Sequence, residues 1–315
     1  SNRGELSCSK QQCRAPTSSS QRQTESRPQT EAPSKHDVTG SHKPHFQPGT
    51  GTPPGALTTE SGTSPSLAIV VPTDDDSTAW YVRTLVRTAE KLGVRTDVCK
   101  LGPAVDEARI RAALADAAAD PAVHGIILQT PLPAGTDKAA LVGMIPPTKD
   151  VDGVNPSSLG GLVTGNEVYP PATAEAVMRI LDHHGVELRG KRVTVVGRSV
   201  VVGKPAAHLL LDRDATVTIA HSRTVDLPAV TRAAEVLVVA VGRAGMITAD
   251  FVAPGAVVVD VGTNDVEGSL VGDVDAQSVQ GVAGAISPVP GGVGPVTTAL
   301  LFEHTVTAAE RAAKR

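Results

Sequence analysis

The sequence predicts an α/β protein of two lobes preceded by a disordered tail. From Pro65 onward, short apolar runs alternate with longer amphipathic stretches, a pattern typical of strands and crossover helices in a parallel sheet. The alternation is interrupted over residues 146–173 and then restarts, which indicates two lobes. Residues 1–65 are rich in Ser, Thr, Gln, Pro and Gly. Such a segment cannot bury enough apolar surface to offset the entropy of ordering.

The first lobe is expected over residues 66–172. Its strands are short apolar runs, and each is followed by a stretch with helical periodicity, so the connections demand a parallel sheet. The predicted strands are 67–71, 96–101 and 125–130, and the predicted helices are 77–93, 106–120 and 137–145.

The second lobe is expected over residues 173–294. Its predicted strands are 191–197, 215–220, 235–242 and 255–262, and a helix is predicted to begin at Gly203. Residues 146–173, between the two alternating regions, are rich in Pro, Gly and Asp. A loop of that length in a compact enzyme is usually either functional or disordered.

Composition argues against several classes of partner. A formal net charge of -4 over 315 residues gives no reason to expect a nucleic acid or a membrane surface, and the apolar runs are too short to span a bilayer. The three cysteines are too few and too irregularly spaced for disulfides or a metal site. We therefore expect a cytoplasmic protein without a metal. For the tail, a passive extension is favoured over a docking or transit-like segment, since no apolar signal core is present.

The second lobe carries a candidate dinucleotide site. In VTVVGRSVVVGKP, an apolar strand leads into Gly197, and Gly203 opens a helix six residues later. Backbone N–H groups and a helix N-terminus receive phosphate in this geometry. Ser199 stands where a plain GxGxxG motif has its second glycine, so an ordinary tight turn is an equal alternative.

The residues after the next strand favour NADP over NAD. An NAD site places Asp or Glu there to hold the ribose 2′-hydroxyl, whereas IAHSRT offers no acid. Arg198, Ser222 and Arg223 instead provide cationic and hydroxyl groups that suit a 2′-phosphate. The alternative is that the arginines are solvated loop residues.

Several motifs resemble, in their order and spacing, those of the bifunctional methylenetetrahydrofolate dehydrogenase/methenyltetrahydrofolate cyclohydrolase family. They are QTPLP, KDVDG, VVGRSVVVGKPAAHLLL, HSRT, VVVDVGTN, GDVD and SPVPGGVGPVTTALL. The resemblance runs from about Pro65 to the C-terminus. It implies an enzyme acting on tetrahydrofolate derivatives, a homodimer, a folate-binding catalytic domain, a Rossmann-like NADP domain and a last helix, from Pro295 to Arg315, that crosses back to the first lobe.

The resemblance also implies particular site residues. In the first lobe, Tyr81 corresponds to the substrate-stacking tyrosine, Gln129 to the active-site glutamine and Asp152 to the pterin-binding aspartate. An aromatic ring stacks on a flat heterocycle, and a carboxylate accepts paired hydrogen bonds from an aminopyrimidine edge. Simple turn chemistry is the alternative for Asp152, beside Gly153. The implied coenzyme contacts are Gly197, Arg198, Ser199, Ser222 and Thr263.

One position departs from the family pattern where chemistry is expected. The family has a general acid/base lysine four residues after the tyrosine, and this chain has Leu85. Arg87 and Lys91 point elsewhere on a helix, so neither replaces the lysine directly. The segment PATAEA, residues 171–176, also departs from the family's PCTPxG pattern.

We therefore expect NADP-dependent oxidation of 5,10-methylenetetrahydrofolate with doubtful cyclohydrolase activity. Removing a hydride from the methylene group moves no proton, whereas hydrolysis of the methenyl cation needs proton transfer. Two alternatives remain: a fully bifunctional enzyme that uses another group, and a non-catalytic folate- or NADP-binding paralogue.

Overall fold

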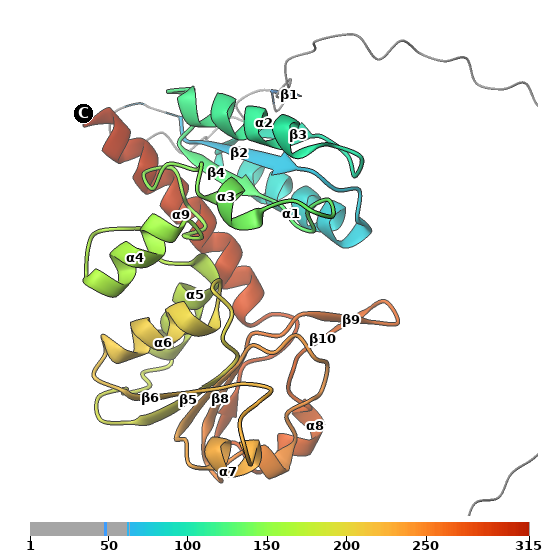
Figure 1. Cartoon of the computed structure of the whole chain (residues 1–315). Coiled ribbons are helices and arrows are strands. Elements are labelled where there is room, and N and C mark those ends of the chain that lie inside the picture. The colour runs from blue at the N-terminus through green and yellow to red at the C-terminus, as the bar shows by residue number, and fades with distance from the viewer. Residues whose placement is uncertain (1–46, 49–61, 63, 315) are drawn as a thin grey trace, which may run out of the picture. The chain divides into compact units, whose positions relative to one another are not determined.

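The computed structural model describes residues 47–48, 62 and 64–314, and it confirms the predicted α/β class (Figure 1). The described chain contains two main sheets, of order β1-β3-β2-β4 and β11-β8-β7-β5-β6. Within this part of the chain, no helix combines the length and the apolar character that crossing a membrane requires.

The first sheet follows the predicted alternation closely. Its parallel strands are β2 (Ser66–Val71), β3 (Arg95–Lys100) and β4 (Gly125–Leu128), and its helices are α1 (Asp76–Leu92), α2 (Glu107–Ala119) and α3 (Lys138–Val142). Asp75, Asp106 and Asp137 cap the three helices by accepting backbone N–H bonds in their first turns. The third helix is shorter than predicted, ending at the Gly143 cap.

Strand β2 explains why helices cover both faces of this sheet. Leu67, Ile69 and Val71 join a core that includes apolar residues of α1 and α9, while Ala68 and Val70 join a separate core with α2 and α3. Alternate side chains of a strand point to opposite faces. A strand that is apolar throughout therefore requires cover on both sides.

The tail prediction falls mostly outside the described residues. Two residues within it, Gln47–Pro48, form the short strand β1, which pairs antiparallel with Val98 and Asp97 of β3. The edge of β3 offers unpaired backbone groups, and composition alone does not reveal that a polar segment will use them.

Residues 146–173 contain a helix that the loop prediction missed. Helix α4 (Pro156–Thr164) begins at an Asn155 cap with Pro156 in its first turn and ends at Gly165 in the left-handed conformation. The Asn-Pro start and the glycine stop were readable signals of a helix. The Gly- and Ser-containing sequence between them obscured its periodicity.

The second sheet is parallel throughout, and its central strands β5, β7 and β8 are largely buried. Its strands are β5 (Arg192–Val196), β6 (Thr216–Ala220), β7 (Val236–Val239), β8 (Val257–Asp260) and β11 (Ala285–Ile286). The helices are α6 (Gly203–Leu211), α7 (Leu227–Arg232) and α8 (Ala276–Val279), with the 3-10 turn η1 (Ala249–Phe251) and the hairpin β9 (Asn264–Val266) and β10 (Ser269–Val271). The helix predicted to begin at Gly203 does so.

Two helices connect the sheets. Helix α5 (Ala172–His183) packs along α6 and along the 21-residue helix α9 (Val293–Ala313), and α9 also contacts β2 and β4 of the first sheet. In Figure 1, α9 is the long red helix at the C-terminal end. Its side chains thus lie beside residues that are more than a hundred positions earlier in the chain.

Candidate functional site

Each sheet has a point where successive connections leave in opposite directions. In the first sheet, β2 lies between β3 and β4, and in the second, β5 lies between β6 and β7. Ligands of open α/β sheets bind outside the carboxyl ends of the strands at such points. Gln129 directly follows β4, and Gly197 directly follows β5.

The first of these points joins α1 to the QTPLP segment. Gln129 is 7% exposed, and its backbone N–H donates to the carbonyl of Val70 at 2.9 Å. The hydroxyl of Thr78 lies 2.8 Å from the carbonyl oxygen of Thr130. Because Thr78 is three residues before Tyr81, this contact holds the turn of α1 that carries the tyrosine beside the glutamine segment.

Tyr81 lies near Asp152 and Thr298, which come from two other parts of the chain. Burial raises the pKa of the Tyr81 hydroxyl well above its ordinary value, the nearby Asp152 carboxylate adds to the rise, and a hydrogen bond with the Thr298 side chain opposes it. The structure therefore brings the predicted tyrosine and aspartate together, with a threonine of α9 that the sequence did not single out.

The two aspartates of KDVDG have different roles. Asp150 is fully buried and accepts hydrogen bonds from the Asn155 N–H at 2.8 Å and the Ser158 hydroxyl at 2.6 Å. Lys149 donates to the carbonyl oxygens of Ala118 and Asp120 at the end of α2. These two residues shape the loop. The Asp152 carboxylate, by contrast, makes no hydrogen bond to any described residue.

The backbone around Asp152 is tightly constrained. Gly153 has φ of +67°, and a Cβ there would lie 2.5 Å from backbone atoms of Pro170 and Pro171, so no other residue fits without movement. Burial raises the pKa of Asp152 to about 7, with Asp150 adding to the rise and the charges of His304 and Lys138 opposing it. A half-buried carboxylate without a hydrogen-bond partner is poised to receive donors from a ligand.

Leu85 is fully buried on the same side of α1. Its side chain is 0% exposed and belongs to the core cluster against which Tyr81 packs. Arg87 and Lys91 are exposed, in agreement with the expectation that neither reaches the position one turn after Tyr81. An apolar side chain thus occupies that place.

The turn between β5 and α6 was predicted from its glycines to bring backbone segments close together, and it does so. Gly197 has φ of +131°, and a Cβ there would lie 2.2 Å from the carbonyl oxygen of Ala240. The hydroxyl of Ser199 accepts the N–H groups of Val202 at 3.1 Å and Gly203 at 3.4 Å at the start of α6. Ser199 therefore has a local structural role, whatever ligand it also contacts.

The other predicted coenzyme residues lie at the carboxyl ends of neighbouring strands. Ser222 and Arg223 follow β6 in a turn closed by the His221 N–H, which donates to the Thr224 hydroxyl at 2.9 Å. Thr263 follows β8. The side chains of Arg198, Ser222, Arg223 and Thr263 are all exposed, so they are available to a ligand and none is held in the core.

A buried carboxylate that sequence reasoning did not use organises the turn after β7. Asp273 is 0% exposed and accepts the N–H groups of Val241, Gly242 and Arg243 at 2.7 to 2.9 Å. The GDVD motif was visible in the sequence, but nothing local to it indicated a partner thirty residues earlier. No group of three or more potential metal ligands occurs among the described residues.

These features define a two-domain α/β protein with a dinucleotide-type turn in its second sheet and an acidic and aromatic site beside its first. The chain belongs to the tetrahydrofolate dehydrogenase/cyclohydrolase family. The catalytic-domain model of that family matches residues 55–152, and its NAD(P)-binding-domain model matches residues 171–313. The resemblance inferred from the motifs is therefore confirmed.

Curated relatives and solved structures agree with this assignment. The chain is 58% identical over 255 residues to "Bifunctional protein FolD 1" of Rhodococcus jostii, covering 81% of this chain and 86% of that protein. It is 59% identical over 251 residues to the protein of the same name from Saccharopolyspora erythraea, covering 79% and 86%.

Two solved structures are similar over most of their length. The Trypanosoma brucei methylenetetrahydrofolate dehydrogenase-cyclohydrolase, complexed with NADP and an inhibitor, has a TM-score of 0.77 and 36% identity, covering 81% of this chain and 90% of that one. A 5,10-methylenetetrahydrofolate dehydrogenase from the silkworm has a TM-score of 0.75 and 35% identity, covering 80% and 89%.

Proposed function

We propose that this protein oxidises 5,10-methylenetetrahydrofolate to 5,10-methenyltetrahydrofolate with NADP and hydrolyses the product slowly or not at all. The observation that carries the proposal is a contrast between two positions one turn apart on α1. Tyr81 lies near the Asp152 carboxylate, whereas the position that resembles the family's proton-transfer lysine holds Leu85, a fully buried apolar side chain.

Folate binding is assigned to three residues of the first domain. Tyr81 stacks on the pterin ring, Asp152 accepts hydrogen bonds from its aminopyrimidine edge, and Gln129 contacts the reacting part of the substrate. Supporting this assignment, the Asp152 carboxylate makes no hydrogen bond within the described part of the chain, and the Thr78 contact with Thr130 ties α1 to the glutamine segment.

NADP is assigned to the second sheet. The turn at Gly197 leads into the N-terminus of α6, and the close approach to Ala240 leaves no space there for a side chain, which suits a diphosphate beside bare backbone. We assign Arg198 and Ser222 to the 2′-phosphate and Ser199 and Thr263 to neighbouring parts of the coenzyme. The NADP complex of the Trypanosoma brucei relative supports this choice.

The dehydrogenase step requires alignment more than proton transfer. When bound, the coenzyme supplies the acceptor for a hydride from the methylene carbon, and the carbon is left as a delocalised methenyl cation with no proton released. The work of Tyr81, Gln129 and Asp152 is therefore to hold the folate in one orientation. None of these tasks needs an ammonium group at position 85.

Hydrolysis makes a different demand. Water adds to the methenyl carbon and must lose a proton, and a ring nitrogen must gain one as its C–N bond breaks, so the reaction needs a group that both takes up and donates protons. Leu85 cannot do so. The expected consequence is that methenyltetrahydrofolate accumulates during turnover.

An assay that follows two signals separately tests the proposal. Purified protein is supplied with methylenetetrahydrofolate and either NADP or NAD, and NADPH formation and methenyl absorbance are recorded against an enzyme-free control for spontaneous hydrolysis. We expect NADPH and methenyltetrahydrofolate to rise together, with methenyl decay close to that of the control. NADPH formation without methenyl accumulation would mean that the protein is fully bifunctional.

Full bifunctionality is the second candidate, since the two bacterial relatives carry the name "bifunctional". In that case, Asp152 is the group to test, because a carboxyl with a pKa near 7 suits acid/base work at neutral pH. A non-catalytic folate- or NADP-binding paralogue is the third candidate. It would bind both ligands and give neither signal.

We also propose which residues form each of the two domains. We assign residues 66–172, with the last helix from position 295, to the folate-binding catalytic domain, and residues 173–294 to the NADP domain. The site of action is the cytosol, in keeping with the free thiol of buried Cys99.

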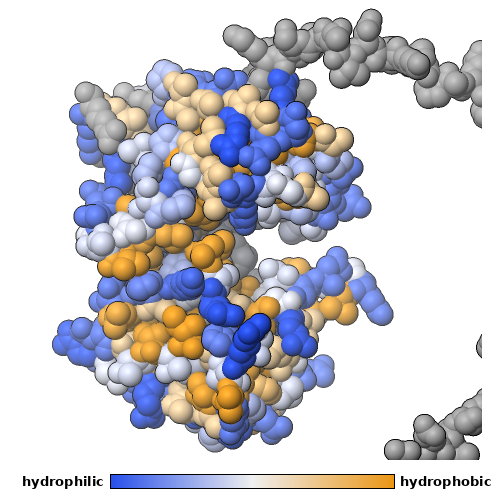
Figure 2. All heavy atoms as spheres, viewed as in Figure 1, coloured by the Kyte–Doolittle hydropathy of each residue, from blue (hydrophilic) through white to orange (hydrophobic). Residues whose placement is uncertain are grey.

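We further propose a homodimer formed through the NADP domain. β6 is an edge strand of the second sheet. Large apolar side chains near it are exposed, namely Leu211 (58%), Ile219 (43%) and Val225 (88%). Figure 2 shows apolar patches over the part of the molecule where α6 and β6 lie. Exposed apolar surface beside an open strand edge is typical of an interface between copies.

A further inference from the structure

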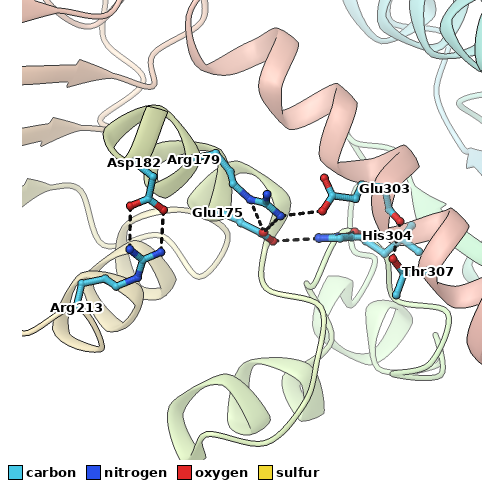
Figure 3. Close-up of polar contacts among 8 residues, drawn as sticks. Glu175, Arg179, Asp182, Arg213, Glu303, His304 and Thr307 are labelled. Atoms are coloured by element: carbon cyan, nitrogen blue, oxygen red, sulfur yellow. Dashed lines mark hydrogen bonds and ion pairs between the residues drawn. The ribbon is translucent and has the colours of Figure 1, made fainter. Parts of the chain in front are cut away.

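His304 lies where α9, α5 and the KDVDG loop come together. Its ring is 5% exposed. Nδ1 lies 2.7 Å from the main-chain oxygen of Val151. Nε2 lies 3.0 Å from Oε2 of Glu175, the contact drawn in Figure 3. His304 is more than a hundred positions from each of these two residues along the chain, so both contacts depend entirely on the packing of α9.

Both neighbours of the ring are acceptors. A carbonyl oxygen only accepts, so Nδ1 carries a proton. Burial by itself raises the pKa of Glu175, but the hydrogen bonds and charges of His304 and Arg179 outweigh it and leave that pKa below its ordinary value. Glu175 is therefore ionised at neutral pH. Both ring nitrogens of His304 therefore face acceptors, and the one facing Nε2 is an ionised carboxylate.

The surrounding charges are fixed by further pairs. Arg179 of α5 lies 2.9 Å from Glu175 and 2.8 Å from Glu303 of α9, as Figure 3 shows. On the other side, the Tyr169 ring lies 5.1 Å from the His304 ring, and the Arg311 guanidinium lies over the same tyrosine. Of these groups, the Glu175 carboxylate makes the direct contact that favours a cationic ring.

The contact bears directly on Asp152. Val151 is the residue before Asp152, and its carbonyl is held by His304. Gly153, the residue after Asp152, has no room for a side chain against Pro170. Asp152 is therefore anchored on both sides. The positive charge of His304 also lowers the pKa of Asp152, against the larger effect of burial.

We propose that His304, held between the Val151 carbonyl and the Glu175 carboxylate as a cation, is a positioning residue that fixes the KDVDG loop and presents the Asp152 carboxylate to the folate. The proposal deepens the function proposed above and rests on it. His304 has two separable contributions, a hydrogen bond that holds the backbone and a charge that acts on Asp152.

Three variants separate these contributions. His304→Asn keeps a donor for the Val151 carbonyl but removes the charge. Glu175→Gln removes the carboxylate that favours the imidazolium while keeping the side-chain size. His304→Leu removes both the donor and the charge. Asp182→Asn is the matched control, because it removes another carboxylate of α5, one that pairs with Arg213 and does not contact His304.

The pH dependence of kcat/KM for methylenetetrahydrofolate is the main measurement. Loss of a nearby cation raises the pKa of Asp152, so the acidic limb of the profile should move to higher pH in His304→Asn and Glu175→Gln, by roughly half a unit to one unit. Asp182→Asn should keep the wild-type profile. In His304→Leu, KM for the folate should also rise, about tenfold, with KM for NADP unchanged.

A second measurement does not depend on activity. In 15N-histidine NMR spectra at neutral pH, the His304 ring should carry two protons in wild type and in Asp182→Asn, and lose the second proton in Glu175→Gln. His304→Asn identifies the signal. A neutral His304 in the wild type, or an acidic limb unmoved in both His304→Asn and Glu175→Gln, overturns the proposal.

The two proposals fail in distinguishable ways. If the wild-type protein does not oxidise methylenetetrahydrofolate with NADP, the proposed function fails, and the NMR signal still reports whether Glu175 holds an imidazolium. If the wild type is active and the variants fold but keep its pH profile, only the role of His304 fails. Should His304→Leu not fold, His304→Asn and Glu175→Gln still carry the test.

Discussion

Replacing Leu85 with lysine would return a proton-transfer group to the pocket. Leu85 lies one turn after Tyr81 and is 0% exposed, so the new ammonium enters an apolar core. Leaving a polar group poorly paired in a protein interior costs about 1–3 kcal/mol. With the lost leucine packing, we expect the free energy of unfolding to fall by about 2–4 kcal/mol.

The expected gain is in hydrolysis. A well-placed general acid/base contributes roughly 10² to 10⁴ in rate, so Leu85→Lys should accelerate methenyltetrahydrofolate decay while changing the dehydrogenase rate far less. Burial lowers the pKa of a lysine, which moves it toward neutrality, where proton transfer is most effective. The gain should therefore depend on pH, with the largest effect near the pKa of the new amine.

The assay measures methenyl decay directly, starting from methenyltetrahydrofolate without coenzyme, together with urea unfolding of each variant. Leu85→Met is the matched control, because it keeps an apolar side chain of similar volume. It should cost less than about 1.5 kcal/mol and leave hydrolysis at the wild-type rate. The reasoning is refuted if the wild-type protein already hydrolyses methenyltetrahydrofolate nearly as fast as it forms it.

Three further outcomes are expected. Arg198→Ala should weaken NADP binding by about 1.5–3 kcal/mol in titration calorimetry, as for a lost charge-assisted bond, with little effect on NAD; equal losses would exclude a 2′-phosphate contact. Because the folded-state pKa of Asp152 is raised to about 7, ionising it costs stability as pH rises from about 4 to 7. Asp152→Asn should therefore raise Tm at pH 8 and have little effect near pH 4, and an effect of the same size at both pH values would contradict the shift. Ile219→Lys on the β6 edge should convert dimers to monomers in sedimentation velocity, and an unchanged sedimentation coefficient would place the interface elsewhere.

The sequence by itself determined the order of strands and helices. Apolar runs such as residues 67–71 and 255–262 predicted buried strands because a parallel sheet covered on both faces requires them. The glycine-flanked turn at Gly197 and the start of α6 at Gly203 were equally readable. These are local signals, in which the residues that interact are close in sequence. Helix α4 was missed although its Asn-Pro start was present, because the apolar residues between its caps show only weak helical periodicity and the segment was predicted as a loop.

Only the tertiary structure decided what individual polar residues do. Asp150 and Asp152 are two positions apart and chemically identical, yet the Asp150 carboxylate accepts hydrogen bonds from its own loop, whereas the Asp152 carboxylate accepts none from the residues that the structure describes. His304 and Glu175 meet across 129 positions, at a helix packing that no local pattern encodes. Burial and long-range pairing are properties of the packed chain. The site residues could therefore be predicted from the family resemblance of the sequence, but only the fold determined which of their side chains lie near one another.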